Sequence, residues 1–462
     1  MKRLRLIGLL TLLSLGFWGQ VASAQGLLGG LLLNVGQVLS NVLSPQPGVI
    51  VRTNLGLAGL QLACLSNGCT VVGNIDGNMN QVFLVRPVQG LLPQLLAGLL
   101  RLVDGILDAE PDQALMIPPN NAKQTSSSTP PQGLWDTTPV NYYGNSVSHG
   151  YVNQPAAQII HIDQAQDVFN VSGAGIVADI DTGVDPNHPA FQGLLLQGYD
   201  FTRNQPGGSE MNDISMSAPP PCETCAAAYV NQHTAAMLDQ HTAAMLDGSQ
   251  YAAFGHGTMV MGVIHLVAPT AKLLPLKAFN ASGSGSLSNI LAAIYYAVQN
   301  NANVINMSFD LTSSSTELKN AINFANSKNV ICVASSGNDG KEEMVYPAGL
   351  QNVMGVASTN NQDQRSSFSN YGNQIVWVAA PGEGVITTYP FATYAAGWGT
   401  SFSSPMVAGT ASLVLSLQPA LGENQTAWAI SHAKWIGLNM GNGRLDVYGT
   451  LSSLQPIQGL LQ

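Results

Sequence analysis

A serine in the stretch GWGTSFSSPMVAG, residues 397–409, stands two residues after a glycine and opens an apolar, small-residue run typical of a buried helix. One explanation is structural, because Ser and Thr are common caps at helix N-termini. The other is chemical, since the free N–H groups there can hold a developing negative charge when Ser401 attacks a carbonyl. The chemical explanation requires a histidine base, an orienting carboxylate and a second oxyanion donor.

Residues of these three types each lie beside a glycine turn. Asp181 ends the strand-like run VADID, His256 lies between two glycines before a small-residue helix, and Asn338 follows a buried-looking strand in SSGNDG. A serine hydroxyl is a poor nucleophile until a neutral imidazole takes its proton and a carboxylate fixes the tautomer of that imidazole. An amide side chain can donate to the oxyanion. We therefore expect a nucleophilic serine site.

Strand ends and helix starts must position these residues, and the chain from about residue 150 onward supplies both. Strand-like runs lie at 175–178, 272–276, 304–307 and 330–334, and helix-like runs lie at 288–299 and 315–327. Strands that alternate with helices predict an α/β fold with a central parallel sheet. Ligands of such sheets bind at the carboxyl ends of the strands, where we expect the chemistry.

The N-terminal part of the chain has a different pattern. Short β-type runs at 49–52, 70–72 and 82–85 are separated by Gly, Asn and Asp turns, and apolar spacing over 95–107 predicts a helix. Residues 118–133 are rich in Pro, Ser and Thr and predict an exposed linker. We therefore predict a small α+β domain at 25–125 and a second domain at 126–462.

Composition and the first residues indicate export. The net charge of −10 and pI of about 5.1 exclude a nucleic-acid-binding protein, because no basic stripe would neutralise phosphates. A basic start, an apolar run from Leu6 to Trp18 and the small residues Ala22-Ser23-Ala24 predict a signal peptide at residues 1–24. No later run is long enough to span a membrane. We expect a secreted or periplasmic monomer without a transmembrane segment.

An oxidising compartment permits disulfides. Cys64 and Cys69 flank the turn-like sequence LSNG, where a disulfide would close a hairpin. Cys222 and Cys225 form a CxxC, for which a small loop disulfide is favoured over zinc because the chain has no second CxxC. Cys332 lies in an apolar run and is expected to be a buried thiol.

Residues 203–250 interrupt the alternation with a polar segment. The octad QHTAAMLD occurs twice in tandem, at 232–239 and 240–247. Two copies are too few for a solenoid, so we interpret the segment as a surface insertion with helical structure. The octad histidines, His233 and His241, are interpreted as solvated rather than metal-binding.

The chain resembles the subtilisin-like serine proteases (subtilases) from about Asp163 to Asp446. The resemblance is carried, in the family's order, by DTGVDPNHP, GHGTMVMGVI, VAPTAKLLPLKAF, SGSGSLSNILAAIYYAVQNNANVINMSF, ASSGNDG, YPAGL, SSFSNYG and GTSFSSPMVAG. It implies a subtilisin-like three-layer α/β fold, with the central parallel sheet flanked by helices. Residues 48–117 more loosely resemble the inhibitory propeptide of this family.

The resemblance implies a role for each matching residue. Asp181 orients the base, His256 is the general base and acid, and Ser401 is the nucleophile. Asn338 and the backbone N–H of Ser401 form the oxyanion hole. The expected activity is that of a serine endopeptidase that hydrolyses proteins or peptides without a cofactor.

The same resemblance implies two segments that hydrogen-bond an extended substrate from either side. They are Gly283-Ser284-Gly285 and Ser308-Phe309-Asp310. Until the chain cuts itself within 117–133, the tail of the propeptide near residues 116–124 is expected to occupy this cleft.

Some residues depart from the family's pattern. Asp179 replaces a frequent apolar residue and points to the same side of its strand as Asp181, so if buried it must be hydrogen-bonded or protonated. Phe402 replaces the methionine that often follows the nucleophile, so peroxide should not inactivate the protein there. Asp310 replaces a frequent glycine beside the substrate and changes specificity in a direction that the sequence does not give.

The family's calcium-binding loop is expected to be lost. Only three residues separate Ile264 from Ala268, and Ala190 replaces an aspartate that often binds the ion. Weak cation sites elsewhere are left open.

Two alternatives to a general protease are left open at this stage. One is a secreted pseudoprotease, in which Asp179, the insertion or a retained propeptide prevents turnover. The other is an enzyme of the same fold that acts on esters or on a single partner protein.

Overall fold

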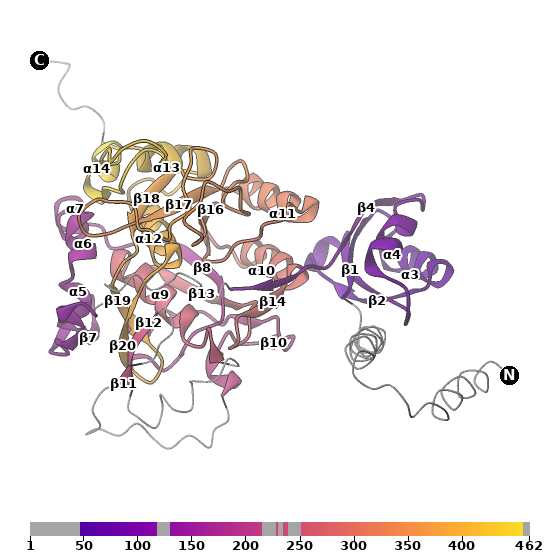
Figure 1. Ribbon diagram of the computed structural model, residues 1–462, viewed down its shortest axis with the longest axis horizontal. Helices are drawn as coiled ribbons and strands as arrows, with labels where there is room; N and C mark the ends of the chain where they lie inside the picture. Colours follow the sequence, from indigo (N-terminus) through magenta and orange to yellow (C-terminus); the bar gives the residue numbers. More distant parts are fainter. Residues whose placement is uncertain (1–46, 118–129, 215–227, 230–233, 239–250, 456–462) are drawn as a thin grey trace, which may run out of the picture.

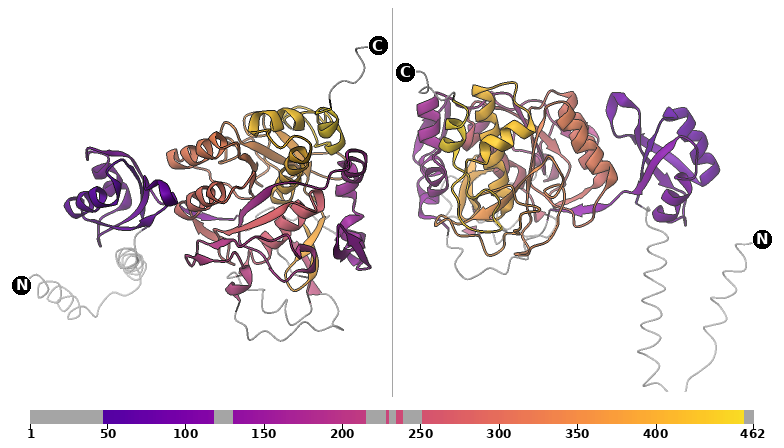
Figure 2. Two further views of the ribbon diagram at one scale, coloured as in Figure 1. Left: turned by 180° about the vertical axis from the view of Figure 1, so that it is seen from behind. Right: turned by 90° about the horizontal axis from the view of Figure 1, so that it is seen from above.

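The computed structural model describes residues 47–117, 130–214, 228–229, 234–238 and 251–455. The predicted signal peptide, the Cys222–Cys225 pair, the two octad histidines and most of the predicted linker lie outside the described residues. Figure 1 shows a small unit, residues 47–117, beside a larger domain. Both views in Figure 2 place the small unit at one end of the molecule.

An eight-stranded sheet forms the centre of the larger domain. Its order is β10-β9-β13-β8-β15-β16-β17-β18, and all neighbours are parallel except the edge pair β10 and β9. The inner strands are buried on both faces, which explains their continuous apolar sequences. The predicted α/β fold with a central parallel sheet is confirmed. The strands are β8 (Ile176–Asp181), β9 (Tyr199–Asp200), β10 (Gln205–Pro206), β13 (Lys272–Lys277), β15 (Val304–Met307), β16 (Ile331–Ser335), β17 (Met354–Thr359) and β18 (Val378–Pro381).

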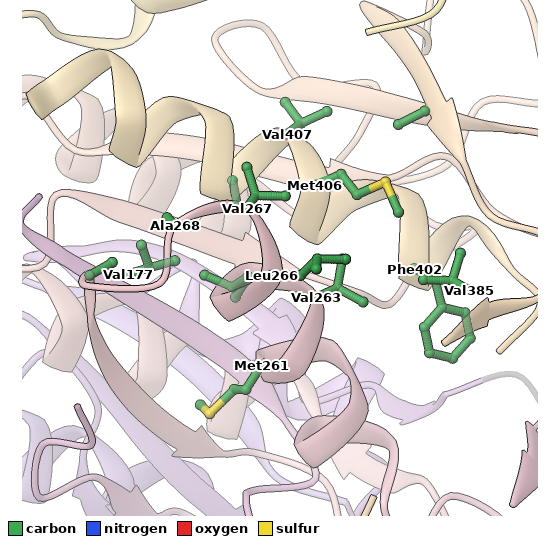
Figure 3. Close-up of a cluster of buried hydrophobic side chains, with 14 of the residues drawn as sticks. Val177, Met261, Val263, Leu266, Val267, Ala268, Val385, Phe402, Met406 and Val407 are labelled. Atoms are coloured by element: carbon green, nitrogen blue, oxygen red, sulfur yellow. The ribbon is translucent and has the colours of Figure 1, made fainter. Parts of the chain in front are cut away.

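Helices cover both faces of this sheet. One face packs on α9 (His256–Val267) and α12 (Thr400–Leu417), and the other packs on α10 (Leu287–Gln299) and α11 (Thr316–Ser327). Successive strand residues alternate between the two layers, so Val177 belongs to the first core and Ala178 to the second. Figure 3 shows side chains of α9 and α12 meeting in the first core.

Shorter elements surround these layers. The helices are α5 (His149–Val152), α6 (Pro155–Ile159), α7 (Ile162–Phe169), α13 (Glu423–Ile430) and α14 (Val447–Ser452), with 3-10 turns η2 (Gln132–Trp135), η3 (Pro189–Phe191) and η4 (Glu210–Asp213). The strands are β6 (Pro139–Tyr142), β7 (Asn145–Ser148) and β14 (Ser284–Ser286). Among the described residues, no helix is both long and apolar enough to cross a membrane.

The predicted surface insertion at 203–250 needs two corrections. Its first residues belong to the domain itself, since Glu210 is fully buried. A second, antiparallel sheet of β11 (Ala228–Tyr229), β12 (Thr234–Leu238), β20 (Thr393–Gly397) and β19 (Val385–Tyr389) includes part of the first octad. The insertion was expected to be helical, and this is wrong at β12, whose backbone pairs with β20.

The small unit is a four-stranded antiparallel sheet, ordered β2-β3-β1-β4, with two helices on one face. Its elements are β1 (Val49–Thr53), α3 (Gly56–Asn67), β2 (Cys69–Asn74), η1 (Gly77–Met79), β3 (Val82–Pro87), α4 (Pro93–Leu100), β4 (Ile106–Pro111) and β5 (Ala114–Met116). The helix expected over 95–107 ends at Leu100, and its last predicted residues belong to β4. The sequence interpretation missed α3 altogether.

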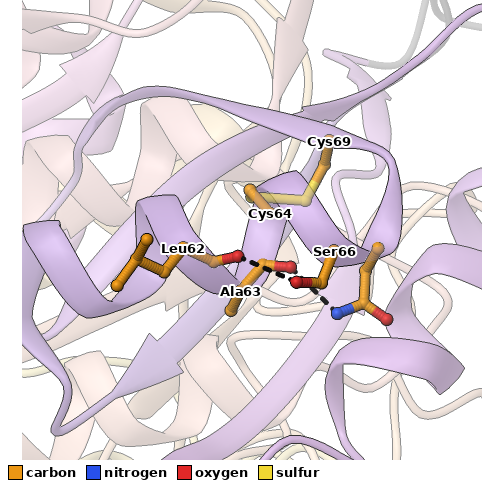
Figure 4. Close-up of a disulfide and its surroundings, with 6 residues drawn as sticks. Leu62, Ala63, Cys64, Ser66 and Cys69 are labelled. Carbon is orange, nitrogen blue, oxygen red and sulfur yellow. Dashed lines mark hydrogen bonds between the residues drawn. A yellow bond between two sulfur atoms is a disulfide. The ribbon is translucent and has the colours of Figure 1, made fainter.

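The disulfide between Cys64 and Cys69 is present (Figure 4). It joins the last turn of α3 to the first residue of β2, so it closes a helix–strand turn rather than the expected hairpin. Gly68, in the left-handed conformation, ends the helix between them. Cys332 is a buried free thiol, as predicted.

Candidate active site

Asp181 and His256 meet at one edge of the central sheet. Asp181 is the last residue of β8, His256 is the first of α9, and His256 Nδ1 lies 2.8 and 2.9 Å from the two carboxylate oxygens. Burial lowers the pKa of His256, but the charge and hydrogen bond of Asp181, with the charge of Glu210, outweigh it and raise the pKa overall. With Nδ1–H donating to Asp181, Nε2 of the neutral ring can accept a proton.

The turns that follow Asp181 and His256 are in direct contact. A Cβ on Gly257 would lie 2.0 Å from the carbonyl oxygen of Gly183, so only glycine fits there. The N–H of Gly257 also donates to Thr182 Oγ1, at 2.9 Å. This close approach fixes the histidine ring against its carboxylate.

Glu210 ties these turns together, and sequence reasoning missed it. Its carboxylate accepts hydrogen bonds from Thr182 Oγ1 at 3.0 Å and from the N–H of Gly255 at 2.8 Å, and also from Thr258 Oγ1. Burial raises its pKa to about 7, although these donors oppose the shift. The residue was assigned to a surface insertion because its neighbours are polar. The available signal in the sequence was its position directly after the turn-like residues Gly207-Gly208-Ser209.

Ser401 is the second residue of α12. Its Oγ donates to the carbonyl oxygen of Ser308 at 3.3 Å, and its N–H belongs to the first turn, where no intrahelical acceptor exists. The ring of the next residue, Phe402, lies 5.9 Å from the His256 ring between centroids. The side chain of Phe402 is buried.

Pro405 lies inside α12, in its second turn. A proline there has no N–H for the carbonyl four residues earlier, which is that of Ser401. Ser308 Oγ donates to this carbonyl instead, at 3.1 Å. Ser308 therefore bonds Ser401 through both its side chain and its backbone.

Asn338 follows β16 and faces the start of α12. Its Oδ1 accepts from the N–H of Thr400 at 2.9 Å and from Thr400 Oγ1 at 3.0 Å. With the oxygen held in this way, the amide NH₂ remains as the donor next to Ser401. This orientation suits an oxyanion contact.

Asp179 is buried under the site, so the condition stated for it applies and its carboxylate must be hydrogen-bonded or protonated. Asn306 Nδ2 donates to its Oδ1 at 2.9 Å, whereas its Oδ2 has no partner among the described residues. Burial, and then the charge of Asp181, raise the pKa of Asp179 well above its usual range. Asn306 also bonds Ser308 Oγ at 3.0 Å and accepts from Ser404 Oγ. An asparagine inside an apolar strand was the available signal for this network.

The two predicted substrate segments differ in their partners and in their exposure. Gly283 directly precedes β14, and Ser284 and Gly285 lie within it, paired with Met116 and Leu115 of β5 in the small unit. In the second segment, Ser308 and Phe309 are buried, and Phe309 packs its ring on Phe279. Only Asp310 is partly exposed. The side chain of Phe309 is therefore part of the core, and only its backbone is placed to meet a substrate.

The residues that imply a lost calcium site are buried. Ala190 and the end of α9 pack in the first core, and Ala190 offers no carboxylate. No group of three or more His, Cys, Asp or Glu side chains in the described ranges is arranged to hold a metal ion. The absence of a metal requirement stays a prediction.

Comparison with known proteins gives a consistent result. A family model described as "Subtilase family" matches residues 173–450. Thermitase of Thermoactinomyces vulgaris is 36% identical over 279 residues, which cover 60% of this chain and 86% of the relative. A thermophilic serine proteinase of Bacillus sp. (strain AK1) is 33% identical over 313 residues, 67% of each chain. Subtilisin Savinase of Lederbergia lenta is 40% identical over 205 residues, 42% of this chain and 74% of the relative.

A solved structure supports the fold as well. Fervidolysin from Fervidobacterium pennivorans, a keratinolytic enzyme related to subtilisin, superposes with a TM-score of 0.66 at 20% identity. The match covers 90% of this chain but 62% of that one, so this chain spans less than two thirds of its length.

Proposed function

The chain belongs to the subtilase family and is a serine endopeptidase, and on that premise we propose that Asp181, His256 and Ser401 form its catalytic triad in a secreted, self-processing zymogen. The observation that carries the zymogen proposal is the pairing of β5 with β14, because a strand of the small unit lies on a predicted substrate segment.

The proposed reaction is acyl transfer through Ser401. His256 Nε2 takes the hydroxyl proton as Oγ attacks the scissile carbonyl, and Asp181 stabilises the resulting imidazolium. The oxyanion receives hydrogen bonds from Asn338 Nδ2 and the N–H of Ser401. The imidazolium then protonates the leaving amine, and a water molecule activated by the same imidazole hydrolyses the acyl-enzyme. Apart from this water, side chains and backbone supply every group in the scheme, so we propose no cofactor.

The contact of the small unit with β14 supports its role as inhibitor. Beyond the paired residues of β5, the N–H of Ile117 donates to the carbonyl oxygen of Gly283 at 2.8 Å. In Figure 1 this strand reaches from the small unit to β14. An extended chain held by backbone bonds at a sheet edge binds as a substrate would. The next residues, Pro118 and Pro119, have no N–H groups to extend such pairing.

Two carboxylates of the small unit bind the N-termini of helices in the larger domain. At α11, Glu110 accepts from Ser315 Oγ at 2.5 Å and from the N–H groups of Thr316 and Glu317 at 3.2 and 3.3 Å. At α10, Asp112 accepts from the N–H and Oγ of Ser288, at 2.9 and 2.7 Å. Free N–H groups and the helix dipole favour negative charge at these positions.

An ion pair adds to this contact. Arg52 Nε lies 2.9 and 3.0 Å from the carboxylate oxygens of Glu317, and Arg52 Nη2 lies 2.6 Å from one of them. The same Nη2 also donates to Tyr295 Oη at 3.1 Å. The side chain of Glu317 is 1% exposed, so this pair is shielded from water on one side. These contacts support a unit that docks specifically on α10 and α11.

Secretion rests on sequence and on one disulfide. The basic, apolar and small-residue pattern of residues 1–24 matches a cleaved signal peptide. The Cys64–Cys69 bond fits an oxidising compartment outside the cytoplasm.

Expression of the chain from residue 25, beside the Ser401→Ala variant, tests this proposal. Intact mass and labelling by a fluorophosphonate are followed over time, with casein as a general substrate. We expect the wild type alone to lose about a hundred residues, to take the label and to digest casein. A folded wild type that neither shortens nor labels would contradict the proposal and favour a pseudoprotease. Labelling without casein digestion would instead favour an enzyme for esters or a single partner.

A further inference from the structure

We propose that Asp310 selects substrates with a cationic side chain, lysine or arginine, at the residue before the scissile bond. This inference rests on the proposed function and names the substrate class of that same site.

The strand register places Asp310 beside the loop that follows β16 and carries Asn338. β15 and β16 pair in parallel, with Met307 opposite Ala334, and three residues further on stand Asp310 and Gly337. A Cβ on Gly337 would lie 2.8 Å from Asp310 Oδ2, which confirms that the two remain adjacent beyond the paired strands. Gly337 precedes Asn338 directly, so the carboxylate lies one residue from the proposed oxyanion donor.

The same two segments flank the nucleophile. Ser308, two residues before Asp310, accepts from Ser401 Oγ, and Asn338 bonds the N–H of Thr400. A carbonyl attacked by Ser401 with its oxygen toward Asn338 is bonded to the α-carbon of the residue before the scissile bond. The side chain of that residue therefore leaves from a point between the two segments, where it meets the carboxylate of Asp310.

Asp310 lacks the partners that other enclosed carboxylates in this protein have. Glu210 accepts from three groups and Glu110 from three, whereas Asp310 accepts no hydrogen bond from any residue in the described ranges. The fully buried side chain of Asn370 points to the same place, and its Nδ2, which would lie 2.5 Å from a Cβ on Gly337, is also unpartnered within those ranges. An enclosed carboxylate without a donor is costly unless a cation or donor reaches it.

The charges around Asp310 are negative. Burial, and then the charges of Asp339 and Glu343, raise the pKa of Asp310 to about 6. The nearby Lys341 is positively charged, but its Nζ lies 3.9 Å from Glu343 Oε2 and both of these side chains are exposed. The site therefore disfavours an acidic side chain, and a bound ammonium or guanidinium group would stabilise the ionised form of Asp310.

The test compares peptide substrates that differ only in the residue before the scissile bond. Lysine and norleucine are a matched pair, since norleucine keeps an unbranched chain of similar length without the charge. The full chain is expressed from residue 25 and allowed to process, and kcat/KM is measured for both peptides at pH 8 and pH 5. The ratio of the two values cancels the titration of His256, which affects both peptides equally.

We expect the wild type to prefer lysine at least tenfold at pH 8 and to lose most of this preference at pH 5, where Asp310 is protonated. In Asp310→Asn the ratio should fall to near one at pH 8. Asp167→Asn, which removes an exposed carboxylate of α7, should keep the wild-type ratio.

The possible outcomes distinguish the role of Asp310 from the proposed protease function. Wild-type protein that takes the fluorophosphonate label and cleaves both peptides without favouring lysine overturns the role of Asp310 and leaves the protease intact. A lysine preference that survives Asp310→Asn overturns it as well. Protein that takes no label and cleaves neither peptide overturns the proposed function, and this inference with it.

Discussion

The larger domain and the small unit bury their apolar residues in different ways. The larger domain encloses its sheet between two helical layers, and its first core consists of its own residues alone, whereas its second core also takes in residues of the small unit. The small unit covers one face of its sheet with α3 and α4, and the alternate residues of the other face pack against the larger domain. Val49 and Val51 lie in its own core, whereas Ile50 and Val82 belong to the second core of the larger domain.

This difference shows that the two parts do not depend on each other equally. The small unit also leaves large leucines of its helices in water, among them Leu62 and Leu65, which are 66% and 79% exposed. A domain of this size has little apolar surface to bury. The sheet face that is covered only by the larger domain therefore contributes a large fraction of the free energy of unfolding of the small unit. We therefore expect changes in the catalytic residues to leave the small unit in place, and changes at the contact to act on inhibition rather than on chemistry.

The largest expected effect lies in the larger domain. Asn338→Ala removes the proposed oxyanion donor and should lower kcat by about 10²–10³-fold, with little change in KM, because such a contact contributes mainly in the transition state. Steady-state kinetics on a peptide substrate measure this. Asn300→Ala, at the exposed end of α10, is the control. Equal kcat values for both variants would exclude Asn338 from the oxyanion hole.

The contact between the two parts comes next. Arg52→Ala leaves the buried Glu317 without its partner and should weaken docking by about 2 kcal/mol, the lower end of the cost for a buried charge pair, because the Arg52 side chain is itself 18% exposed. The processed protein should then gain activity about 30-fold faster on dilution, if association is unchanged. Arg86→Ala, an exposed arginine on β3, is matched to it. The same rate for both variants would show that the ion pair does not hold the inhibitor.

The smallest of these effects lies within the small unit. Cys64→Ser opens a loop with a sequence separation of 5, which should destabilise the unit by about 2 kcal/mol. Amide hydrogen exchange should become faster in residues 47–117 and stay unchanged in the larger domain. Ser66→Ala, in the same turn, serves as the control. Faster exchange throughout both parts would mean that the larger domain depends on the small unit after all.

Much of the fold and the main site positions could be predicted from the sequence. Asp181 ends an apolar strand and His256 starts a helix, and parallel sheets bring such positions to one edge. The two residues are in contact there, as expected, and their catalytic roles follow from the family as a proposal. The strands at 175–178, 304–307 and 330–334 were found because strands buried on both faces have continuous apolar sequences.

The missed features have physical reasons too. The spacing of apolar residues over 95–107 could not show that Gly105 turns the chain back into β4. Glu210 was invisible because its partners, Thr182, Gly255 and Thr258, are far from it in the chain. Polar sequence around a buried carboxylate looks like a surface loop until those contacts are known.

The helix caps made by Glu110 and Asp112 have a consequence for how the protein would be switched on. While the chain between the two parts is intact, these contacts form within one molecule, so docking does not depend on the concentration of the protein. Once the linker is cut, the same contacts depend on the bulk concentration of the protein. A concentrated solution of the cut protein would then stay latent and a dilute one would become active, so dilution itself would act as the trigger.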